Sequence, residues 1–135
     1  MSRFLCVIVF FLLYLSLSAQ HHSLSNKLRS ENRVFTLESI LKDPKFGGKD
    51  SISAWQEIKS LYEKAKEEKV AEVEIISDLL AADFYARTND ELNPKTDFYF
   101  ARALSTAKRI RSKELQLIAL IREGYYYFGH RELEM

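Results

Sequence analysis

Apolar positions recur along this chain with a fixed 42-residue offset. When the segment 70–91 is laid over the segment 112–133, the apolar side chains fall in register. The matched pairs are Val73 with Leu115, Ile75 with Leu117, Ile76 with Ile118, Leu79 with Ile121, Ala82 with Gly124, Phe84 with Tyr126 and Tyr85 with Tyr127. A second stripe matches in the same way: Ile58, Leu61, Tyr62 and Ala65 correspond to Phe100, Ala103, Leu104 and Ala107. A fixed period of this size is typical of stacked helical hairpins, in which each unit buries its apolar face against its neighbours.

The pattern predicts an all-α fold, a short right-handed stack of antiparallel helix pairs over residues 53–135. We expect about four main helices and one short helix before them, over residues 34–41. The sequence from Asp43-Pro44 to Gly47-Gly48 should end that short helix. A lone helix of two turns is marginal in water, so we expect it to pack on the stack as an N-terminal cap.

The first main helix is predicted to begin at Ser53, which has capping-box spacing to Gln56. No Gly or Pro interrupts the chain from there to Arg87, so one continuous helix is an alternative. The 42-residue register favours two helices with a turn near Lys69. The next helix should begin at Asn93-Pro94, where Asn caps and Pro occupies the first position. The last helix should run from Ser112 to about Phe128, before Gly129.

The N-terminus has the layout of a secretory signal peptide over residues 1–19. Arg3 is followed by an apolar run from Phe4 to Leu17, and Ser18 and Ala19 offer small residues for cleavage. The run is shorter than the ~20 residues that cross a bilayer as a helix, which favours a cleaved signal peptide. An uncleaved membrane anchor is the alternative. We expect export to the periplasm or the extracellular space, with residues 20–52 forming a flexible leader that includes the short helix.

Composition narrows the classes of partner. The chain carries 20 Lys and Arg residues against 19 Asp and Glu residues, so global charge gives no reason to expect nucleic acid. The single cysteine, Cys6, lies inside the predicted signal peptide, which excludes a disulfide framework and thiol catalysis from the processed chain. The basic cluster Arg102, Lys108, Arg109, Arg111 and Lys113 is interpreted as solvated helix surface and not as a phosphate site.

With these residues in hand, the chain resembles a tetratricopeptide repeat array of the longer-period type. The segments 82–85 and 124–127 resemble the small residue and following aromatic of the first helix of such a repeat, and the segment 103–108 resembles the end of the second helix. The resemblance covers roughly residues 53–135, and exported arrays of this kind resemble the sensing region of bacterial membrane-bound regulators. The register predicts one more helix than the sequence contains, which would leave the last helix without its hairpin partner.

The resemblance implies a concave groove lined by the first helix of each unit. It implies that Tyr85 and Tyr127 pack between helices. The predicted partner-binding residues in the groove are Asp83, Arg87, Tyr125 and Phe128. The alternative is that Tyr125 and Phe128 contact the absent partner helix, because four consecutive aromatic residues cannot all face one side of a helix.

Reactive constellations are sparse. If cleavage follows Ala19, His22 would be third from a free amine and could bind Cu(II) or Ni(II), with a plain polar leader as the alternative. His130 has no partner at ligand spacing, and no phosphate loop or nucleophile motif is present. We therefore expect no enzyme and no cofactor, but an exported protein-interaction or ligand-sensing module. The alternative function is a truncated fragment or subunit whose last helix docks on a partner chain or forms an oligomer.

Overall fold

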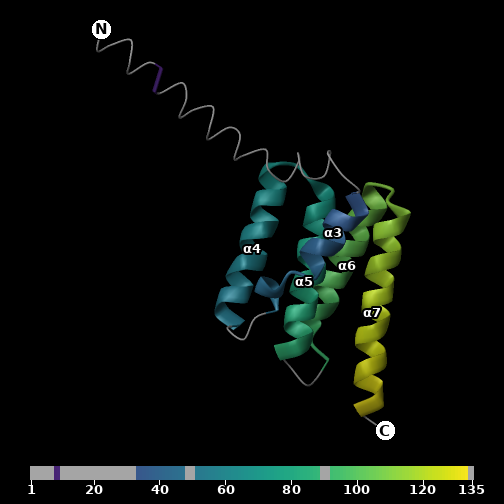
Figure 1. Cartoon of the computed structure of the whole chain (residues 1–135). Helices are drawn as coiled ribbons and strands as arrows, with labels where there is room; N and C mark the ends of the chain where they lie inside the picture. Colours follow the sequence, from purple (N-terminus) through teal and green to yellow (C-terminus); the bar gives the residue numbers. More distant parts are fainter. Residues whose placement is uncertain (1–7, 10–32, 48–50, 89–91, 134–135) are drawn as a thin grey trace.

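The computed structural model describes residues 8–9, 33–47, 51–88 and 92–133. Within these ranges the chain is all-helical and contains no strand, which confirms the all-α part of the fold prediction (Figure 1). The elements are α3 (Arg33–Leu41), the 3-10 helix η1 (Pro44–Phe46), α4 (Ser51–Glu67), α5 (Ala71–Thr88), α6 (Pro94–Arg109) and α7 (Lys113–Leu133). The expected signal peptide, apart from residues 8–9, lies outside the described residues, as do His22 and the rest of residues 20–32 and 48–50 of the leader.

The helix boundaries repeat the 42-residue offset of the sequence. This offset separates the end of α4 from the end of α6, and the start of α5 from the start of α7. Lys69 and Arg111 occupy the intervening turns, both in the left-handed region with φ of 55° and 57°. After each of them a backbone N–H reaches back to close the preceding helix: Val70 N donates to Ala65 O at 2.9 Å, and Ser112 N donates to Ala107 O at 3.0 Å. The predicted turn near Lys69 is confirmed, and a single continuous helix is wrong.

Two of the predicted helix starts have the expected caps. The side chain of Asn93 accepts from Lys95 N at 2.9 Å, with Pro94 in the first turn of α6. Ser112 Oγ accepts from Leu115 N at 3.3 Å at the start of α7. Both side chains accept hydrogen bonds from backbone N–H groups that have no partner inside the helix.

Two predicted boundaries are wrong. Helix α4 begins at Ser51, so Ser53 is an exposed residue of its first turn and not its cap. The spacing of Ser53 to Gln56 is a signal from two residues alone, too weak to fix a boundary. Helix α7 continues through Gly129 to Leu133. One glycine inside a helix costs only about 1 kcal/mol, which is too little to end it.

Helix α5 is the centre of the fold and packs against α3, α4, α6 and α7. Its residues from Ile75 to Ala82 are buried on every side, so the core runs along this helix. Helices α4 and α7 form opposite edges of the molecule (Figure 1). The short helix α3 lies against α5 with Leu37 buried, as predicted for an N-terminal cap.

An aromatic cluster joins α4, α5 and α6. The Trp55 ring of α4 lies 5.2 Å from the Tyr85 ring of α5, and Tyr85 stacks on Tyr99 of α6 at 5.7 Å. Tyr85 therefore packs between helices, as expected. Tyr127 of α7 also lies between helices, where its hydroxyl donates a hydrogen bond to the Asp97 carboxylate of α6.

A buried ion pair lies beside this cluster. Asp78 on α5 is 2% exposed at its side chain and receives the Nε and Nη2 groups of Arg102 on α6, with Nη2 at 2.5 Å. The Arg102 guanidinium also lies 4.4 Å from the Tyr62 ring. Burial raises the pKa of the Asp78 carboxyl, and the hydrogen bond and charge of Arg102 oppose that shift. Arg102 is thus a structural residue joining α5 to α6, separate from the exposed Lys108 and Arg109 of the predicted basic cluster.

Candidate functional site

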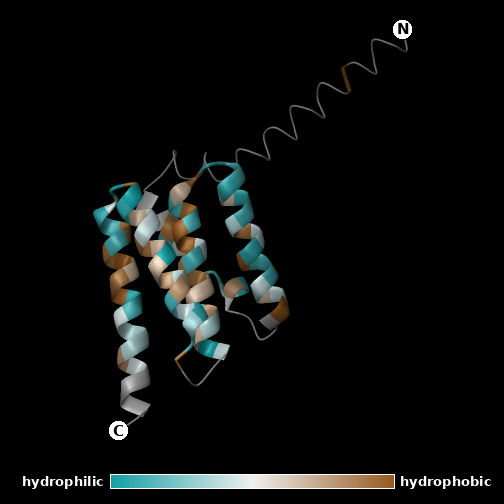
Figure 2. Ribbon diagram, turned by 180° about the vertical axis from the view of Figure 1, so that it is seen from behind, coloured by the Kyte–Doolittle hydropathy of each residue, from teal (hydrophilic) through white to brown (hydrophobic). Residues whose placement is uncertain are grey.

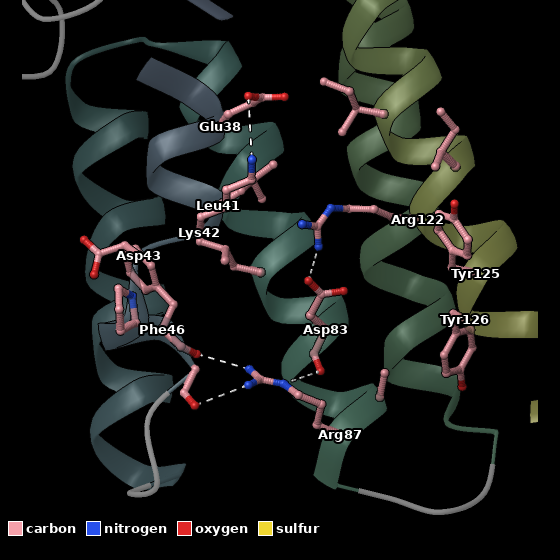
Figure 3. A pocket seen from close by; sticks show the side chains of 16 residues that line it. Glu38, Leu41, Lys42, Asp43, Phe46, Asp83, Arg87, Arg122, Tyr125 and Tyr126 are labelled. Carbon is pink, nitrogen blue, oxygen red and sulfur yellow. Dashed lines mark hydrogen bonds and ion pairs between the residues drawn. The ribbon is translucent and has the colours of Figure 1, made fainter. Parts of the chain in front are cut away.

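A cleft of about 930 Å³ opens between the N-terminal elements and α7. Helix α5 forms its floor, α3 and η1 form one wall, and α7 forms the other (Figure 3). We call it the α3–α7 cleft. Its lining includes Leu41, Pro44 and Phe46 from the first wall, Leu80, Asp83, Ala86 and Arg87 from the floor, and Ile118, Ile121, Arg122 and Tyr125 from the second wall. The volume is in the range of ligand sites, and the lining combines apolar side chains with charged ones: Glu38, Lys42 and Asp43 on the first wall, Asp83 and Arg87 on the floor, and Arg122 on the second wall.

Three of the four residues predicted to bind a partner line this cleft. They are Asp83, Arg87 and Tyr125, and Tyr125 is 74% exposed. Phe128 does not line it and lies 62% exposed on the opposite side of α7 from the core. Residues three apart on a helix differ by about 60° around its axis, and Phe128 lies one such step beyond Tyr125, on the side away from Arg122.

An ion pair crosses the cleft from the floor to the second wall. Arg122 Nη1 donates to Asp83 Oδ2, and each side chain keeps about a third of its surface exposed. Burial raises the pKa of the Asp83 carboxyl, while the positive charges of Arg122 and Arg87 act to lower it. The pair therefore places both signs of charge inside the cleft.

Arg87 connects the floor to the first wall. Its Nη2 donates to the carbonyl of Phe46 at 3.2 Å, its Nη1 donates to the carbonyl of Gly47 at 3.5 Å, and its Nε donates to Asp83 O at 3.2 Å (Figure 3). A Cβ added to Gly47 would lie 3.1 Å from Arg87 Nη1. Arg87 thus holds η1 against α5.

Arg122 and the first wall were not among the residues expected from the sequence. A signal for Arg122 existed, because it stands between Ile118 and Tyr126 on the core side of α7 at helical spacing. A charge in that position is rarely buried without a partner. The first wall had no such signal, since Pro44 and Phe46 belong to the segment expected to end the short helix.

Comparison with models of protein families, with curated proteins and with solved structures finds no match to this chain. Function is therefore inferred from the geometry of the chain itself.

The remaining candidate groups lie in part outside the described residues. The side chain of His130 is outside the described part of the chain. Among the described residues, no group of three or more His, Cys, Asp or Glu side chains could hold a metal ion. None of the helices described is both long and apolar enough to pass through a membrane. The α3–α7 cleft is thus the described region best suited to contact another molecule.

Proposed function

We propose that this protein is a non-enzymatic protein-interaction or ligand-sensing module that holds a peptide segment in the α3–α7 cleft. The observation that carries the proposal is the cleft itself, about 930 Å³ in volume and open along α5, in which Asp83, Arg87 and Tyr125 meet. The repeat register of the sequence points to the same three residues, together with Phe128. Export through the N-terminal segment belongs to the same proposal.

The lining fits a peptide that is largely apolar. Side chains such as Leu41, Pro44 and Ile121 offer apolar contact on both walls. Asp83 and Arg122, whose side chains are partly exposed, can also form hydrogen bonds with a polar side chain or a backbone amide of the ligand. Tyr125 presents a large ring with a polar tip, a combination enriched where proteins bind one another.

We further propose that the helices form a tetratricopeptide-like array. The 42-residue offset shared by the helix boundaries and by the left-handed turn residues supports this arrangement. In that arrangement α5 and α7 are equivalent first helices, and the cleft between them and α3 corresponds to the concave groove.

The test begins with selection of binding peptides from a random displayed library against the full chain. Calorimetry then compares the wild type with Tyr125→Ala and with the double variant Tyr125→Ala, Arg87→Ala. We expect the dissociation constant to rise about tenfold or more for Tyr125→Ala, in line with the loss of a central aromatic contact. Lys59→Ala, an exposed change on α4, is the matched control and should leave affinity unchanged.

Tyr125→Ala is the cleaner variant because Arg87 also anchors η1. A double variant that keeps its helicity and its full affinity for the selected peptides would refute the cleft as the binding site.

A further inference from the structure

Helix α7 has two apolar faces, of which the described fold covers one. Leu115, Ala119 and Tyr126 form its buried face against the core. On the opposite side lies a second row, which we call the outer stripe: Leu117, Leu120, Ile121, Gly124, Tyr125 and Phe128. The spacing of this row is i, i+3, i+4, i+7, i+8 and i+11, the pattern of a helix face that packs against another element.

The equivalent positions of α5 are covered. Ile75, Asp78, Leu79 and Ala82 are the counterparts of Leu117, Leu120, Ile121 and Gly124 in the 42-residue register, and each is at most 1% exposed. In the outer stripe the large side chains are open, with Leu117 58%, Leu120 50%, Ile121 48%, Tyr125 74% and Phe128 62% exposed. No described element lies beyond α7 at that edge of the fold (Figure 2). The composition of α7 is thus that of a helix packed on both sides.

We propose that a second copy of this chain covers the outer stripe, through an antiparallel α7–α7 pair whose two-fold axis passes between Arg122 and Glu123. This proposal does not rest on the proposed function, but Ile121 and Tyr125 belong to both the outer stripe and the cleft wall, so a second copy and a peptide would compete for them.

The outer stripe is symmetric about its centre. A two-fold interface requires that if residue i contacts residue j of the partner, j also contacts i. Leu117 and Phe128 lie at equal distances on either side of the axis, about 8 Å along the helix at 1.5 Å per residue. Leu120 and Tyr125 form the next pair inward, about 4 Å from the axis. Every member of the stripe therefore meets another member of the stripe in the second copy.

Side-chain sizes match at the centre of the stripe. The innermost pair is Ile121 with Gly124, so the branched side chain of one copy faces the bare backbone of the other. A Cβ built on Gly124 has nothing within 4 Å inside its own chain. Packing within the described fold therefore does not require a glycine at this position. A glycine here does leave room where two helices would approach most closely.

The area of the stripe is sufficient for a dimer. The exposed fractions of the five large side chains correspond to about 600 Å² per copy, if each can offer roughly 200 Å². A symmetric pair that covered these side chains completely would bury about 1,200 Å² from them, which is the lower end of stable interfaces.

The test measures sedimentation velocity of the chain expressed from its full sequence, at concentrations up to about 100 µM, a range that detects micromolar association. We expect a concentration-dependent dimer. Leu117→Lys and Phe128→Glu should each raise the dissociation constant at least about tenfold, because each places a charge against an apolar side chain twice per dimer. Ile52→Lys is the matched control: it adds the same charge at a 70% exposed apolar site on α4, at the other edge of the molecule, and should leave the dimer unchanged. Circular dichroism confirms that the variants keep their helices.

The register is tested by mixing the two single variants. In the mixed dimer, one contact is the native Leu117 with Phe128 and the other joins the new lysine to the new glutamate. Mixing should therefore restore the dimer that neither variant forms alone. A wild-type chain that stays monomeric across the range overturns the proposal and leaves the stripe to a different protein. A dimer that Leu117→Lys does not weaken, or that mixing does not restore, overturns the assigned surface or the antiparallel register. Leu117 and Phe128 do not line the α3–α7 cleft, so loss of the dimer in these two variants is distinguishable from loss of peptide binding in Tyr125→Ala.

Discussion

The ion pair between Asp78 and Arg102 should respond unequally to loss of its two partners. The Asp78 side chain is 2% exposed, whereas the Arg102 side chain is 35% exposed and reaches toward solvent. Arg102→Met leaves a buried carboxylate without its cation, which typically destabilises by about 3–5 kcal/mol. Asp78→Asn keeps an acceptor for the guanidinium, and its effect should be smaller, about 1–3 kcal/mol. Since a domain of this kind is stable by about 5–15 kcal/mol in total, Arg102→Met should remove a large share.

The double variant Asp78→Leu, Arg102→Met supplies the control. It removes both charges together and fills the space with apolar atoms, so its free energy of unfolding should be closer to that of the wild type than the value for Arg102→Met is. The assay is urea unfolding followed by far-ultraviolet circular dichroism at neutral pH and low protein concentration.

The same pair predicts a pH dependence. Burial raises the pKa of Asp78 above its ordinary value of 3.8 in the folded state, so the folded chain binds this proton more readily than the unfolded chain does. The stability contributed by this group is fully present below the unfolded pKa and is lost as the pH rises through the folded pKa. Arg102→Met removes the cause that lowers this pKa, so its destabilisation should shrink as the pH falls toward 3.8. A larger destabilisation by Asp78→Asn than by Arg102→Met, or a difference that acid leaves unchanged, would refute this account of the pair.

Three further predictions concern the turns and two tyrosines. Lys69→Gly and Arg111→Gly should each raise the free energy of unfolding by about 1 kcal/mol, because both residues have a positive φ that glycine adopts without strain. Urea unfolding in which one variant is stabilised and the other destabilised would contradict this. Tyr126→Phe should lower the same free energy by about 1–3 kcal/mol, since the hydroxyl accepts from the N-cap amide of α6 at 2.9 Å; an unchanged midpoint would show that water replaces the contact. The hydrogen bond to Asp97 raises the pKa of Tyr127 to about 12, so the stability from this group should be lost as the pH rises from about 10 through 12. Ultraviolet titration of the Tyr127→Phe variant should show the missing high-pH tyrosine, and an unaltered titration curve would rule out this assignment.

The helices could be predicted because their signals, a repeat register and short caps, can be read from the sequence without knowing how the helices pack. The 42-residue register located the turns at Lys69 and Arg111 although neither turn contains glycine. Asn93-Pro94 fixed the start of α6 through a cap whose geometry involves neighbouring residues only. The boundaries that failed, at Ser53 and Gly129, depend on differences of about 1 kcal/mol that packing overrides.

The ion pairs could not be predicted, because they depend on how the helices are rotated about their axes. Asp78 lies within an apolar run and is the counterpart of Leu120, so the register gave no reason to expect a carboxylate partner there. Its partner Arg102 comes from a different helix, 24 residues away. Asp83 lines the cleft, as do Arg87 and Tyr125, but its pairing with Arg122 could not be predicted without the same knowledge.

Some residues predicted for the groove also line the cleft. The register placed Asp83 and Tyr125 on equivalent faces of α5 and α7, and the structure brings them to one cavity. The opposite wall comes from α3 and η1, which lie outside the repeating segment, so no periodicity could indicate it.

The most direct test of the central claim is a nuclear magnetic resonance titration of the full chain with a peptide selected for binding. If the α3–α7 cleft holds the peptide, the largest shifts in backbone amide resonances should fall on Asp83, Arg87 and Arg122, with smaller shifts along α4. Shifts concentrated on the exposed face of α4, with those three residues unchanged, would contradict the account.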